Sequence, residues 1–189
     1  MEGKNSMCPS RVPYFERFTA AQSKTSLTEH ADVSARSKCC FPKYAEIISP
    51  PIEDASNPSL GRLTAKPIAN KLNKEIKIDE TFIEIPTENI EMDQKQNWLK
   101  QLVQKEKKQL PSNIKLWEKN IYEKIKGFRQ NTIIFSHFMV INSILSTLSS
   151  HNHLLYFYPG YSSVTKIINI DGELNYFLCE DNKKTFINL

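Results

Sequence analysis

The stretch NTIIFSHFMVINSILSTL, residues 131–148, decides the fold of this 189-residue chain. Its first part, residues 132–135, is β-branched and aromatic, which is typical of a strand buried on both faces. From Met139 onward the apolar residues recur at intervals of three and four, as they do on one face of a helix. The sequence therefore predicts a strand that runs directly into a helix, with Ser136 and His137 at the junction.

His137 is thereby placed where α/β proteins bind ligands. In open α/β sheets the ligand crevice lies at the carboxyl ends of the strands, and a helix N-terminus there offers free N–H groups to an anion. The same spacing also fits a histidine that only caps the helix. The pattern alone leaves both interpretations open.

The remaining segments alternate between helical and extended patterns. We expect strands at 44–49 and 76–78, extended chain at 81–86, and hairpin strands at 163–170 and 174–179, joined by a two-residue Asp171-Gly172 turn. We expect helices at 62–72 and through the basic stretch 91–129, which Pro111 interrupts. This order predicts an α/β domain.

Several of these motifs together resemble the histidine phosphatase (phosphoglycerate mutase-like) superfamily. Ser136-His137 matches its second histidine motif, and the likeness runs from Thr64 to Leu189 through TAKPIANKLN, FIEIP, LWEKNIYEKI and YPGYSSVTKI. The resemblance implies a three-layer α/β/α sandwich with an atypical or incomplete N-terminal part. It also implies phosphomonoester hydrolysis through a phosphohistidine, with no metal and no other cofactor.

The resemblance implies catalytic roles for His137 and Glu84. Glu84 stands where the family has a carboxyl group that protonates the leaving alkoxide and then activates water. Phe138 replaces the glycine that usually follows the histidine, and its backbone N–H remains a candidate phosphate donor. The alternative for Glu84 is an outward-facing side chain on an edge strand.

Two further polar positions are candidates for phosphate binding. The family has a phosphate-binding arginine one helical turn before the residue matched by Thr64, but Leu60 stands there and Arg62 is only two residues away. Two residues rotate a helix by about 200°, so Arg62 is either a displaced clamp or a solvated side chain. By the same resemblance, Ser162 and Ser163 are expected to reach the site.

The nucleophile motif is the part of the family pattern that this sequence lacks. The family opens with a strand that ends in Arg-His-Gly, and no Arg-His pair occurs anywhere in this chain. His30 is the nearest candidate, although Glu29 at the arginine position would repel phosphate. Residues 1–43 are polar and without periodicity, which predicts a disordered or irregular segment before a domain at 44–189. We predict that residues 44–49 fill the central position of the sheet, or that it is poorly filled.

The composition narrows the range of partners. A net charge of +4 mildly favours anionic partners, and we expect a phosphorylated small molecule or a phosphoprotein, with no nucleic acid. The four cysteines lack zinc-site spacing, and a reducing, cytoplasmic location fits them. The helix after His137 carries Asn142 and Ser143 and is too short for a membrane span, so no membrane association is expected.

Two functions from different classes follow. The first is a phosphatase whose nucleophile motif is displaced, or lost from this chain by truncation or a reading-frame error. The second is a non-catalytic relative that binds a phosphorylated ligand or a protein partner, because removal of the nucleophile eliminates the covalent route. The substrate stays open, since the residues that select it lie in variable loops.

Overall fold

The computed structural model describes residues 16–21, 46–51, 60–87, 90–91, 93–160 and 162–179. Its strands are β1 Glu16–Ala21, β2 Glu46–Ser49, β3 Ile76–Ile78, β4 Thr132–Ser136, β5 Val164–Ile170 and β6 Glu173–Leu178. Its helices are α2 Leu60–Leu72, α3 Lys95–Gln104, α4 Ser112–Gly127 and α5 Phe138–Leu148, with short 3-10 turns η1 Glu80–Phe82 and η2 Lys107–Gln109. None of the helices in these ranges is long and apolar enough to cross a membrane.

The strands form one mixed sheet in the order β3-β2-β4-β1-β5-β6. β4 pairs in parallel with β2 and with β1, and β2 pairs in parallel with β3. β5 runs antiparallel to β1, and β6 runs antiparallel to β5. The carboxyl ends of β1, β2, β3 and β4 therefore meet at one edge of the sheet, and β5 begins there.

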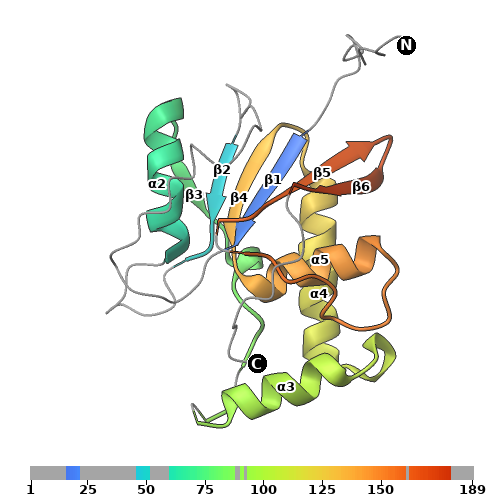
Figure 1. The fold of residues 1–189 in the computed structure, drawn as a ribbon. Coiled ribbons are helices and arrows are strands. Elements are labelled where there is room, and N and C mark those ends of the chain that lie inside the picture. The colour runs from blue at the N-terminus through green and yellow to red at the C-terminus, as the bar shows by residue number, and fades with distance from the viewer. Residues whose placement is uncertain are drawn as a thin grey trace, which may run out of the picture.

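Helices cover the sheet on both faces (Figure 1). α2 packs on one face through Ala65, Ile68 and Ala69, which contact the β2 and β4 side chains that point that way. α4 and α5 pack on the other face, where Ile121 and Ile144 join a larger apolar cluster. The prediction of a three-layer α/β/α sandwich is confirmed.

The junction at residues 131–148 forms as predicted. All five residues of β4 are buried, as the apolar run requires of a central strand. α5 begins one residue after His137, and eight of its eleven residues are buried. The hairpin is also as expected: Asp171 and Gly172 have φ angles of 52° and 89°, the two positive values that a type I′ turn needs.

The central position of the sheet is filled by β1, and here the prediction from the sequence is wrong. β1 lies between β4 and β5, whereas residues 46–49 form β2 on the other side of β4. Residues 16–21 lie in the segment expected to be disordered or irregular, and that expectation is wrong for these six residues. The backbone bonds of two flanking strands hold β1 in place, which its own polar composition does not reveal.

Residues 81–86 were expected to be extended, and they are so only in part: Thr81 and Phe82 belong to the turn η1, Ile83 has an extended backbone, and no strand forms. Asp79 caps the 3-10 turn η1, and the chain after Phe82 continues without strand pairing. Phe82 and Ile85 are both buried in the core. The apolar residues of this segment therefore reflect packing in the core and not a strand.

Candidate functional site

His137 lies where a buried strand gives way to a helix. It follows Ser136 at the carboxyl end of β4 and is the N-cap residue of α5, with an extended backbone at φ −101° and ψ 168°. Its carbonyl accepts the first bond of the helix, from the Ile141 N–H at 3.2 Å. The half-buried His137 is thus held where α5 begins, at the positive end of the helix dipole.

Glu84 reaches the same helix end from a distant part of the chain. Its carboxylate oxygens accept from the Met139 N–H at 3.2 and 3.4 Å, and Oε1 also accepts from the Ile85 N–H at 2.9 Å. The structure therefore brings Glu84 and His137 together, although 53 residues separate them in sequence. Because Glu84 lies on no strand, the alternative of an outward-facing edge-strand residue does not describe its place.

The backbone on either side of Glu84 is tied to the surrounding elements. The Ser136 hydroxyl donates to the Phe82 carbonyl at 3.1 Å, and the Trp117 indole N–H donates to the Ile83 carbonyl at 3.2 Å. β4 and α4 therefore fix the two residues that precede Glu84. This anchoring gives the carboxylate a defined position at the start of α5.

Asp79 holds the beginning of the same segment. Its carboxylate accepts from the Thr81 N–H at 3.0 Å and pairs with Lys124 at 2.7 Å. Burial by itself raises the pKa of Asp79, but the hydrogen bonds from Lys124 and Thr81 outweigh it, so the pKa lies below the ordinary value of 3.8. The ionised form is therefore the one that stabilises the fold.

We expect Asp79→Asn to lower the free energy of unfolding by about 1 kcal/mol at pH 7, because the asparagine oxygen can still accept from the Thr81 N–H but the negative charge that pairs with Lys124 is lost. A lowered folded-state pKa stabilises the protein above the unfolded value of 3.8, and this contribution is lost as the pH falls through the folded value. The gap between wild type and variant in urea unfolding should therefore be smaller at pH 3 than at pH 7. Glu173→Gln, at an exposed position, is the control; an equal gap at both pH values would contradict the assignment.

Phe138 and Tyr158 form an aromatic pair beside His137. Phe138 is the first residue of α5, and its ring centroid lies 6.1 Å from that of Tyr158 at an interplanar angle of 55°. Phe138 also packs against an apolar cluster that includes Leu102 of α3, as do Trp98 and Leu99. The Phe138 ring, which stands where the family has a glycine, therefore packs against Tyr158 and this cluster. The backbone N–H of Phe138 remains a predicted phosphate donor.

Arg62 occupies the first turn of α2 and is exposed. The start of this helix lies against the carboxyl end of β2, because a Cβ added at Gly61 would meet Ser49 Oγ at 2.9 Å and Pro50 at 3.2 Å. Arg62 is therefore near the same sheet edge as His137 but on the helix that covers the opposite face. Its role in phosphate binding stays a prediction.

Ser163 and His30 are the two remaining predicted site residues. Ser163 is buried immediately before β5, and since Val164 pairs with Ala20, Ser163 lies near the carboxyl end of β1. Its contact with a ligand stays a prediction. His30 lies outside the described residues.

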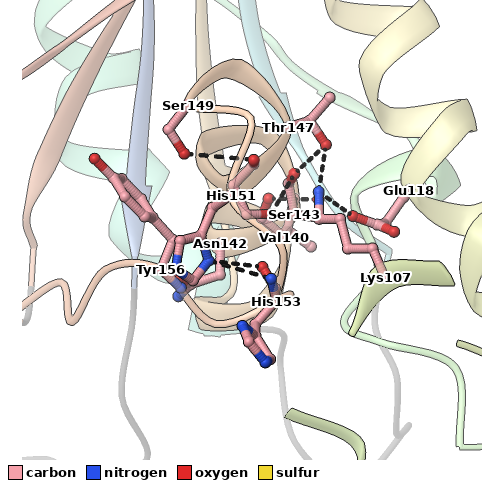
Figure 2. Close-up of polar contacts among 11 residues, drawn as sticks. Lys107, Glu118, Val140, Asn142, Ser143, Thr147, Ser149, His151, His153 and Tyr156 are labelled. Carbon is pink, nitrogen blue, oxygen red and sulfur yellow. Dashed lines mark hydrogen bonds and ion pairs between the residues drawn. The ribbon is translucent and has the colours of Figure 1, made fainter. Parts of the chain in front are cut away.

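His151 and His153 lie beyond the C-terminal end of α5. Figure 2 shows them beside Tyr156, whose ring centroid is 5.3 Å from that of His151. In the same view Lys107 Nζ donates to Thr147 Oγ1 at 2.9 Å and pairs with Glu118 at 2.9 Å, tying this helix end to α4. Within the described ranges no three His, Cys, Asp or Glu side chains are grouped to hold a metal ion.

Three residues of the site were missed by reasoning from the sequence. Trp117, Ser136 and Tyr158 lie in segments that carry the family resemblance, but the sequence indicated no role for them in the site. Each acts through a partner 20 to 54 positions away, at Ile83, Phe82 and Phe138 respectively. No local periodicity carries such a signal.

Comparisons with known proteins find similarity in structure and none in sequence. No family model and no curated protein matches the chain. The phosphoserine phosphatase of Entamoeba histolytica, solved with 3-phosphoglyceric acid, is 17% identical with a TM-score of 0.57, over 89% of this chain and 97% of that one. A phosphoglycerate mutase of Bacillus anthracis is 14% identical with a TM-score of 0.55, over 89% and 93%. A mycobacterial glucosyl-3-phosphoglycerate phosphatase, solved with inorganic phosphate, is 8% identical with a TM-score of 0.54, over 90% and 97%.

Proposed function

This chain has the phosphoglycerate mutase-like fold of the histidine phosphatases, and we propose that it hydrolyses phosphomonoesters at the carboxyl edge of its sheet. The observation that carries the proposal is the meeting of Glu84 and His137 at the N-terminus of α5. A carboxylate, an imidazole and free helix N–H groups are the parts that phosphoryl transfer needs, because the chemistry depends on positioning and on stabilising spread negative charge.

The phosphate group is assigned to the first turn of α5. The Phe138 N–H and the His137 imidazole would contact its oxygens, while Glu84 remains on the neighbouring Met139 N–H. Arg62, in the first turn of α2, is the candidate cation for the same group. The 3-phosphoglyceric acid solved with one similar protein and the inorganic phosphate solved with another are consistent with a small phosphomonoester as the ligand.

The covalent route requires a second imidazole, and His30 is the candidate. Its nitrogen would attack phosphorus as the bond from phosphorus to the ester oxygen breaks, and Glu84 would give its proton to the leaving oxygen. Water would then attack the phosphohistidine, with Glu84 taking the proton back and phosphate leaving. No metal and no cofactor takes part in the proposed route.

One observation favours a second function, the binding of a phosphorylated ligand without turnover. β1 ends at Ala21, opposite Ser136, and Gln22 follows it in sequence. The family's nucleophilic histidine directly follows this strand, whereas His30 is nine residues beyond Ala21. A chain with this arrangement keeps the anion site of α5 even where the covalent step is absent.

Hydrolysis of p-nitrophenyl phosphate without metal, together with calorimetric titration of inorganic phosphate, separates the two functions. Each is measured for the wild type, His137→Ala, His30→Ala and Glu84→Gln, with His153→Ala as the matched histidine control. Turnover that falls to background in His137→Ala and His30→Ala supports the phosphatase. Phosphate binding that depends on His137, without turnover, supports the binding protein. Wild-type protein that is folded and neither binds phosphate nor turns over would overturn both.

A further inference from the structure

We propose that Phe138 and Tyr158 make this site selective for aryl phosphomonoesters. The inference rests on the proposed phosphate position at the start of α5 and names the class of leaving group that it accepts. Phe138 directly follows His137, so a phosphate bound at His137 lies one residue away from an aromatic ring. The leaving group of a bound ester extends from that phosphate and contacts the side chains around it.

Tyr158 places a second ring at the same point. It belongs to the segment between α5 and β5, and its contact with Phe138 brings that segment back to the beginning of the helix. Tyr158 is 38% exposed, so part of its ring faces outward at the rim of the site. The exposed part of Tyr158 is the surface on which a third aromatic group can pack, in the offset or edge-to-face geometry that aromatic pairs prefer.

The pair is held in position before any ligand arrives. Phe138 packs against a cluster of buried side chains that includes Met139 and Leu154, and the partly buried Trp98 and Leu99 pack against the same cluster. Phe138 also carries the carbonyl that accepts from the buried Asn142 amide at 3.1 Å, which fixes its backbone. A rim that is already ordered does not lose conformational entropy when an aryl group stacks on it.

Aromatic surface discriminates between classes of leaving group. A phenyl ring gains stacking and apolar contact against Phe138 and Tyr158, whereas a glycerate carboxylate or a methyl group gains little. The two rings also carry no cation that would favour an anionic leaving group. The structure thus points to phosphate esters of phenols.

The test compares phenyl phosphate with methyl phosphate, two monoesters that share the phosphate group and its charge. We expect wild-type protein to bind phenyl phosphate about three- to tenfold more tightly by titration calorimetry, or to show that ratio in kcat/KM where turnover occurs. Tyr158→Ala should remove most of the preference, so that the affinities for phenyl phosphate and for methyl phosphate become nearly equal. Tyr158→Phe keeps the ring and should keep the preference, and Phe177→Ala, at an exposed aromatic on β6, is the matched control.

The outcomes separate this inference from the proposed function. Equal binding of the two esters by the wild type would overturn the aryl preference and leave the phosphate site standing. A preference that survives in folded Tyr158→Ala would overturn the assignment to this ring pair. Binding of neither ester would overturn the phosphate site itself, and the aryl preference with it.

Discussion

Replacing Phe82 with alanine is expected to lower the free energy of unfolding by about 4 kcal/mol, the usual cost of truncating a buried phenylalanine. Phe82 is fully buried among the side chains that join the sheet to α4 and α5. Its ring stacks on that of Phe128 with centroids 6.4 Å apart. The variant loses this contact and leaves a cavity that the close-packed surroundings cannot fill.

Thermal and urea unfolding measure the Phe82→Ala effect. For a chain of this length a loss of about 4 kcal/mol corresponds to a Tm lower by roughly 8 to 16 °C. Phe177→Ala, whose ring is 54% exposed, is the matched control and should change the stability by no more than about 1 kcal/mol. If Phe82→Ala is no more destabilising than this control, the packing between η1 and α4 is not as described.

The second large effect is expected for Asn142→Ala, with a loss of about 3 kcal/mol. Asn142 is fully buried in α5, and its Oδ1 accepts from the N–H groups of Tyr156 at 2.9 Å and Phe157 at 2.7 Å. Its Nδ2 donates to the Phe138 carbonyl at 3.1 Å. Alanine leaves the two N–H groups without this acceptor, and an unsatisfied buried donor costs more than the hydrogen bond was worth.

Asn142 also connects two segments of the chain that contribute to the candidate site. It links the start of α5, which carries Phe138, to the segment that carries Tyr158. We therefore expect Asn142→Ala to loosen this segment as well, seen as faster amide hydrogen exchange at Tyr156 and Phe157 than at Ile133 in β4. Asn175→Ala, at an exposed position on β6, should alter neither stability nor exchange. Unchanged exchange at Tyr156 and Phe157 would show that other contacts hold the segment.

The strongest local patterns were enough to predict much of the fold. The apolar run of β4 and the three- and four-residue spacing of α5 both reflect burial, so they predicted these elements and the junction at His137. Asp171-Gly172 predicted its turn because few residue pairs tolerate two positive φ angles. The position of His137 at a strand-to-helix junction also followed, since it depends on residues next to it in sequence.

The sequence by itself therefore determined the α/β class, the junction and the position of His137 at the start of α5, because neighbouring residues encode each of them, while the three-layer arrangement was implied by the family resemblance. Only the tertiary structure decided which strand lies at the centre, because β1 is held by backbone bonds to β4 and β5 that do not depend on its side-chain pattern. It also decided that Glu84 leaves the expected strand and reaches Met139, and that Tyr158 returns to Phe138. The last two contacts join residues 55 and 20 positions apart, and Arg17 of β1 pairs with Thr132 of β4, 115 positions away. Their energy comes from packing and hydrogen bonds that exist only once the layers have assembled.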